Sequence, residues 1–175
     1  MNFDSGKKRG HKKKTIKGDK MIKEKQKEIH FYTQQIETLY SSIQKWLEDK
    51  NYHFKRENIE INEEKTGKYK AEKLLLCKPE KMIAELKPIG LDIIGAHGRV
   101  DLVTQYENRK FLYFKDGGPV ITTKIEGQKK EHRIFSGIEE DGWYWVESIT
   151  LKKAYKVNRE VFSSLLEEVT SKWVI

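Results

Sequence analysis

The sequence has a single cysteine and no long apolar segment, and each absence excludes a class of protein. With Cys77 alone, the chain can form no internal disulfide and no metal site built on a pair of cysteines. No segment approaches the roughly 20 apolar residues of a membrane-spanning helix, and the N-terminal lysines precede no apolar secretory signal. We therefore expect a cytoplasmic protein without membrane association, or a nuclear one if the host is a eukaryote.

Common motifs for phosphate and metal binding are also missing. "KDGGP" at residues 115–119 has turn residues but lacks the strand-loop-helix setting of a phosphate-binding loop. None of the five histidines has a metal-ligand spacing with another. We expect no cofactor and no enzymatic activity, with one exception described below that would require Mg²⁺.

Positive charge is abundant but lies mostly at one end of the chain. The 175 residues carry a formal net charge of +8, of which residues 1–20 contribute eight cations against two acids. The eight cations are Lys7, Lys8, Arg9, Lys12, Lys13, Lys14, Lys17 and Lys20. Because this segment has almost no apolar side chains, it predicts a disordered basic arm, residues 1–18, before a single domain, residues 19–175.

An amphipathic helix is predicted over about residues 20–49, with Asp19 as its N-cap. The apolar positions recur at alternating spacings of three and four: Ile29, Tyr32, Ile36, Leu39, Ile43 and Trp46, with Tyr40 and Leu47 beside them. These positions also fit about three heptads, so a homodimer through this helix remains an alternative. The bulk of the aromatic side chains favours a helix that lies across a sheet.

The middle of the chain alternates short apolar segments with turn residues, which predicts strand after strand. Turns are expected at Asn108-Arg109, Asp116-Gly117, Gly127-Gln128 and Asp141-Gly142, and the Asp-Gly pairs are typical of two-residue hairpin turns. Because the gaps are too short for crossover helices, we expect a curved, mostly antiparallel sheet with a meander from residue 98 to 157. Within "DGWYWVE", alternation places Trp143 and Trp145 on one face and Tyr144 on the other. Core packing is the expected role of two of the four tryptophans, with stacking on unpaired bases as the alternative.

A second helix is predicted at the C-terminus. Val161, Leu165, Leu166 and Val169 have helical spacing, and Asn158 is the expected N-cap. The predicted fold class is therefore α+β, with a long helix packed on the sheet and a closing C-terminal helix.

One hairpin resembles the catalytic hairpin of PD-(D/E)xK nucleases: "GRVDLV" at 98–103 followed by "KFLYFK" at 110–115. The resemblance implies that Asp101 binds Mg²⁺ and that Lys115 supplies the lysine. Tyr113 occupies the position of the second carboxylate, however. A Glu-x-Lys sequence occurs instead at Glu85 to Lys87, ahead of Asp101, so the nuclease alternative uses Asp101, Glu85 and Lys87.

The same hairpin has a purely structural interpretation. Strand alternation would place Val100 and Leu102 in the core and leave Arg99 and Asp101 as a solvent-facing charge pair across strands.

The basic arm suggests the function. Its lysines suit attraction to a phosphate backbone more than the recognition of bases. We predict a non-catalytic protein associated with RNA or DNA without sequence specificity, whose folded body is an interaction module for a protein partner. Two alternatives are open. One is an immunity, antitoxin or complex-subunit protein that binds only protein, and the other is the metal-dependent nuclease, active or degenerate.

Overall fold

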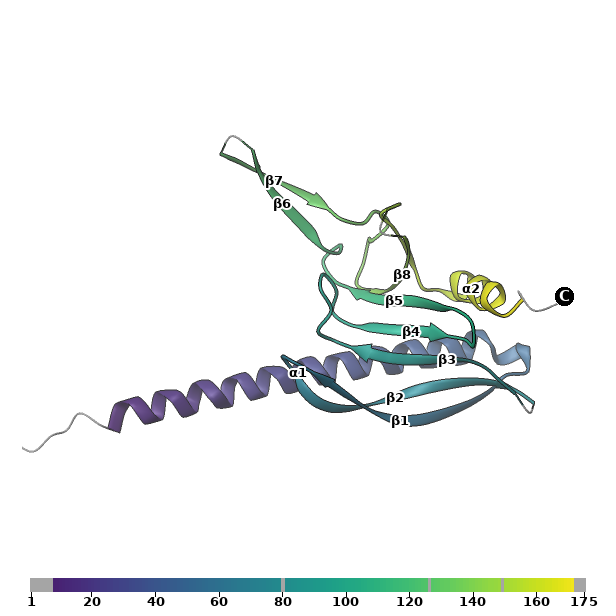
Figure 1. Ribbon diagram of the computed structural model, residues 1–175, viewed down its shortest axis with the longest axis horizontal. Helices are drawn as coiled ribbons and strands as arrows, with labels where there is room; N and C mark the ends of the chain where they lie inside the picture. The colour runs from purple at the N-terminus through teal and green to yellow at the C-terminus, as the bar shows by residue number, and fades with distance from the viewer. Residues whose placement is uncertain (1–7, 80, 126, 149, 172–175) are drawn as a thin grey trace, which may run out of the picture.

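The computed structural model describes residues 8–79, 81–125, 127–148 and 150–171, which form two helices, a short 3₁₀ turn and nine strands (Figure 1). In chain order these are α1 (Lys8–Trp46), the 3₁₀ turn (Glu48–Lys50), β1 (His53–Glu63), β2 (Gly67–Lys78), β3 (Lys81–Gly90), β4 (Arg99–Val103), β5 (Asn108–Phe114), β6 (Val120–Ile125), β7 (Gln128–Arg133), β8 (Gly142–Ser148), β9 (Lys153–Lys156) and α2 (Arg159–Ser171).

Seven of the strands form one open sheet in the order β1-β2-β3-β4-β5-β8-β9, and every named pair is antiparallel. The predicted α+β class is confirmed. The continuous meander is wrong at one place, because β6 and β7 leave the sheet as a separate two-stranded ribbon and β8 pairs with β5 in their place.

Both helices cover the same face of the sheet, which we call the inner face. The apolar stripe predicted for α1 is buried there against strand residues such as Leu86 and Leu102. α2 adds Phe162, Leu165, Leu166 and Val169 to the same cluster, and the Phe162 ring lies 6.3 Å from that of Phe111 on β5. The face of α1 that would form a coiled-coil seam is thus packed inside its own chain. Among the described residues, no helix covers the opposite sheet face, which we call the outer face.

α1 is longer than the sequence pattern indicates. The expected start was near residue 20 with Asp19 as N-cap, whereas the helix begins at Lys8, so Asp19 is an interior residue and the cap prediction is wrong. The backbone of residues 8–18, expected as part of a disordered arm, is helical. Lysine and arginine have good helix propensity, and a helix already nucleated by buried turns extends at little cost.

The C-terminal helix matches its prediction. The Asn158 side chain accepts a hydrogen bond of 2.9 Å from the backbone N–H of Val161, which is N-cap geometry. Val161 is half-buried, and Leu165, Leu166 and Val169 are buried. Both the N-cap and the apolar face of α2 could be predicted because each depends only on residues close together in the sequence.

The structure confirms one of the predicted turns and contradicts another. Asp116 and Gly117 both have positive φ, and Gly118 N–H donates to the Lys115 carbonyl, as expected for a two-residue turn. The turn predicted at Asn108-Arg109 is wrong, since both residues lie in β5 and the chain reverses at residues 104–107. There the Thr104 hydroxyl accepts from the backbone N–H of Tyr106 and Glu107, so a threonine makes the turn.

Two other turns shift or disappear. Gln128 pairs with Ile125, so the ribbon turns one residue earlier than Gly127-Gln128. Gly142 begins β8 and pairs with Phe114 of β5, so Asp141-Gly142 is not a hairpin turn.

Candidate functional site

The N-terminal half of α1 extends beyond the sheet (Figure 1). Between Asp19 and Glu28 every side chain is exposed except the half-buried Lys25. Residues 8–28 hold ten cations against the acids Asp19, Glu24 and Glu28. Of the eight predicted arm cations, Lys20 is exposed on this helix, Lys7 lies outside the described residues, and for the six between Lys8 and Lys17 only the backbone is described. The segment presents dense positive charge on a regular scaffold.

The predicted charge pair of β4 has a different geometry from the one expected. Arg99 donates from Nε and Nη2 to the two carboxylate oxygens of Asp101, both at 2.7 Å, within one strand rather than across two. Asp101 is only 3% exposed, so it is not solvent-facing, and Arg99 covers it. Val100 and Leu102 are fully buried on the inner face, as predicted.

The nuclease residues do come together in space. Lys87 of β3 is the register partner of Asp101, and Glu85 is the partner of Val103, so all three side chains belong to the outer face. Both carboxylates are already engaged, however: Asp101 by Arg99, and Glu85 by Lys73 at 3.1 Å. The described residues include no group of three or more His, Cys, Asp or Glu side chains arranged to hold a metal ion.

Lys115, the lysine that the nuclease resemblance implied, lies elsewhere. Its ammonium group sits 3.6 Å from the centre of the Phe31 ring of α1, away from Asp101. The hairpin in "GRVDLV…KFLYFK" therefore does not assemble the expected pair of functional groups.

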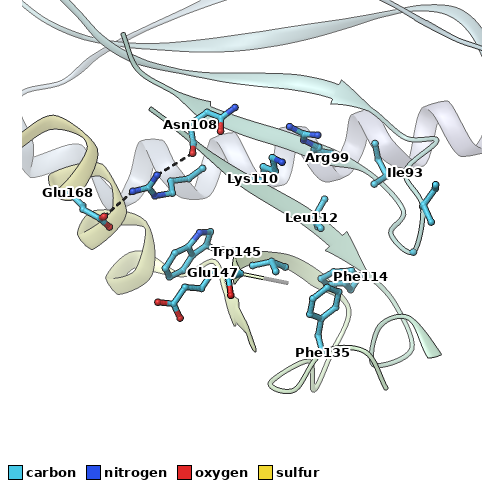
Figure 2. A pocket seen from close by; sticks show the side chains of 15 residues that line it. Ile93, Arg99, Asn108, Lys110, Leu112, Phe114, Phe135, Trp145, Glu147 and Glu168 are labelled. Atoms are coloured by element: carbon cyan, nitrogen blue, oxygen red, sulfur yellow. Dashed lines mark hydrogen bonds and ion pairs between the residues drawn. The ribbon is translucent and has the colours of Figure 1, made fainter. Parts of the chain in front are cut away.

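A cavity of about 730 Å³ lies where β5 and β8 diverge, between outer-face side chains of β4, β5 and β8 and inner-face residues such as Arg109 and Trp145 beside α2 (Figure 2). Arg99, Arg109 and Lys110 supply its positive charges, and Leu112, Phe114, Phe135, Val146 and Trp145 supply most of its apolar wall. Its two acids are Glu147 and Glu168, and Glu168 accepts a hydrogen bond of 2.9 Å from Arg109. The sequence pattern did not reveal this cavity, because its lining comes from five separate segments.

The buried hydroxyl of Tyr32 holds the backbone at the start of β4, where Arg99 lies. Tyr32 of α1 donates to the backbone carbonyl of Arg99 at 2.6 Å and accepts from the N–H of Gly90 at 3.2 Å. Burial raises the pKa of Tyr32, so the hydroxyl keeps its proton. A Cβ at Gly98 would lie 2.6 Å from the Tyr32 ring, which explains the glycine there. The helical spacing of Tyr32 predicted a core position but gave no indication of these hydrogen bonds.

The carboxylate of Glu63 holds the start of the same loop. It accepts hydrogen bonds from the Tyr69 hydroxyl at 2.6 Å and from the backbone N–H of Asp92 at 2.8 Å. Burial raises the pKa of the Tyr69 hydroxyl, and its hydrogen bond to the Glu63 carboxylate raises the pKa further. These contacts tie the β1–β2 hairpin to the segment that leads to Arg99.

The β6–β7 ribbon is the second element that stands away from the body (Figure 1). Its base is fixed by Arg133, which donates to the Gly117 carbonyl at 2.7 Å, and by the backbone bond from Ile134 to Pro119. Near the tip, Lys124 and Lys129 are register partners and both are exposed. Two like charges directly opposite each other disfavour the ribbon.

Comparisons with protein-family models, with curated proteins and with solved structures found no match. Among the described residues, no helix combines the length and the apolar character that crossing a bilayer requires.

Proposed function

We propose that this protein binds the phosphate backbone of nucleic acid through the N-terminal half of α1, residues 8–28, and that the folded body is an interaction module. The observation that carries the proposal is the projection of this strongly cationic helix beyond a body that is close to neutral. Its ten cations against three acids complement a polyanion.

The chemistry of the helix favours the backbone over the bases. Nine of the ten cations between residues 8 and 28 are lysines, and a lysine ammonium acts as a point charge rather than as a bidentate fork. Each phosphate that a lysine neutralises releases counterions, which gives affinity without sequence preference. The protein would thus bind nucleic acid without sequence specificity, and phosphate attraction alone does not distinguish RNA from DNA.

The experiment compares two charge-matched variants by fluorescence anisotropy with labelled 25-nucleotide single strands and duplexes of mixed sequence. One variant carries Lys12→Gln, Lys13→Gln and Lys14→Gln in α1. The control carries Lys45→Gln, Lys55→Gln and Lys70→Gln, which removes the same charge from exposed positions of the body. Glutamine preserves helix propensity, and circular dichroism verifies the helix.

We expect the α1 variant to bind nucleic acid at least about tenfold more weakly than wild type at low salt. The control variant should bind within about twofold of wild type. Equal losses in both variants would show that net charge alone matters and would overturn the proposal. Absence of binding by the wild-type protein would also overturn it and would favour a protein-only partner.

A further inference from the structure

Positive charge surrounds the buried Asp101 on the outer face. Lys87 on β3 and Lys110 on β5 are its register partners on either side, and Arg99 holds both of its oxygens. Directly opposed residues on neighbouring strands lie side by side on one face. Three cations therefore gather at one carboxylate, which leaves a local net charge of +2.

The two lysines of this cluster are available to a ligand. Lys87 and Lys110 are exposed, and within the described residues neither takes part in an ion pair or hydrogen bond. Arg99 uses Nε and Nη2 for Asp101 and leaves Nη1 outside that pair. The buried carboxylate thus holds the guanidinium in place without neutralising the cluster.

The cluster adjoins an apolar wall. Lys110 and Arg99 line the cavity of about 730 Å³ together with Leu112, Phe135 and Trp145. Figure 2 shows Lys110 and Arg99 along the strands at one side of the cavity, with Leu112, Trp145 and Phe135 beyond them. A concave site of a few hundred cubic ångströms, mostly apolar with a few convergent charges, is the usual form of a small-molecule site.

We propose that this cavity binds a small organic anion. Its phosphate or carboxylate group would meet Lys110 and Arg99, and its flat apolar body would lie against Leu112 and Phe135, which pack in the outer-face cluster. The acids of the lining do not oppose this placement, because Glu168 is held by Arg109 and Glu147 is exposed, 3.4 Å from the Tyr155 hydroxyl. The site is separate from α1 and does not depend on nucleic-acid binding.

Isothermal titration with three matched probes tests the proposal: 1-naphthyl phosphate, 1-naphthoate and the neutral 1-naphthamide. Wild-type protein should bind at least one of the anions with a single saturable site and the amide about tenfold more weakly or worse. Binding of the phosphate alone or of the carboxylate alone assigns the anionic group, and binding of both assigns the shared negative charge.

Three variants locate the site. Lys110→Gln should weaken anion binding about tenfold, Lys110→Arg should retain it, and Lys55→Gln on the remote strand β1 should leave it unchanged. Lys110 is exposed, so these variants keep the fold. Equal affinity for amide and anions, no binding of any probe, or an unaffected Lys110→Gln variant would overturn the proposal. The α1 variant Lys12→Gln, Lys13→Gln, Lys14→Gln should bind the anions normally, which separates this proposal from the function of α1.

Discussion

Arg99 and Asp101, two residues apart on β4, form a bidentate ion pair in which both hydrogen bonds measure 2.7 Å. The Asp101 side chain is buried at 4% exposure, whereas the Arg99 side chain remains 25% exposed. Bonding to Asp101 raises the pKa of Arg99, so the guanidinium is charged at every accessible pH. A buried carboxylate is tolerated only with its partner in place. The pair therefore fixes a cation at the rim of the cavity between β5 and β8.

Removing Arg99 should be costly for this reason. Arg99→Gln leaves the Asp101 carboxylate buried without its bidentate donor, and we expect a loss of about 3 kcal/mol in the free energy of unfolding. Urea denaturation measures it. Lys110→Gln, an exposed charge change on the next strand, should change that free energy by no more than ~0.5 kcal/mol. A similar small effect for both variants would contradict the role assigned to the pair.

Divalent metal should not stabilise the wild-type protein. Both oxygens of Asp101 accept from Arg99 and Glu85 accepts from Lys73, so Mg²⁺ or Mn²⁺ would have to displace two cations. We expect a shift in Tm below about 1 °C at millimolar metal, where a bound ion would give several degrees. Thermal unfolding measures the shift. A large shift that Asp101→Asn abolishes, together with metal-dependent cleavage of nucleic acid, would instead support the nuclease alternative.

Alkaline pH should destabilise the fold through its buried phenols. Burial raises the pKa of Tyr40 above its ordinary value of 10.0, and its hydroxyl donates to the Leu86 carbonyl at 2.9 Å. Because the folded state holds this proton more tightly, the stabilisation is complete below pH 10 and is lost as the pH rises further. Each such phenol contributes a slope of up to roughly 1.4 kcal/mol per pH unit.

Urea unfolding between pH 9 and pH 11 tests this assignment. Tyr40→Phe should be less stable than wild type at pH 9, because it loses the hydrogen bond to Leu86, and should show a shallower decline above pH 10. Parallel declines in the two proteins would show that Tyr40 is not one of the titrating groups.

Removing the repulsion between the opposed lysines of the β6–β7 ribbon should stabilise the ribbon. Lys124→Glu converts a like-charge pair with Lys129 into an opposite-charge pair, so the ribbon should open less often. We expect amide hydrogen exchange in β6 and β7 to slow by about two- to fivefold, with the seven-stranded sheet unaffected. Lys124→Gln should give a smaller effect in the same direction. Faster exchange in Lys124→Glu would contradict the repulsion.

Local patterns predicted the helices and most strands. The stripe from Ile29 to Leu47 determined which face of α1 is buried, because helical spacing specifies a face without knowledge of the partner. The N-terminal part of α1 was not predicted because residues 8–18 have no apolar periodicity, although their helix propensity allows a helix. Trp143 and Trp145 pack toward the inner cluster and Tyr144 toward a smaller outer one, as alternation predicted.

Features that depend on distant segments could not be predicted. Asp116-Gly117 correctly signalled a turn, but nothing local shows that the next strand leaves the sheet. Proline is disfavoured inside a strand, yet β3 continues through Pro88 to Gly90 because its pairing with β2 stops at Leu86, which leaves that side of β3 without ladder hydrogen bonds. The burial of Asp101 and its cluster with Lys87 and Lys110 required the register of three strands.

The salt dependence of nucleic-acid binding tests the central claim most directly. Binding of a mixed-sequence duplex is measured over a range of salt concentrations for wild type and for the variant Lys12→Gln, Lys13→Gln, Lys14→Gln. Each of these lysines that contacts a phosphate should reduce the slope of log affinity against log salt by ~0.9. We predict a clearly shallower slope for this variant and the wild-type slope for Lys45→Gln, Lys55→Gln, Lys70→Gln. Identical slopes in all three proteins would contradict binding through α1.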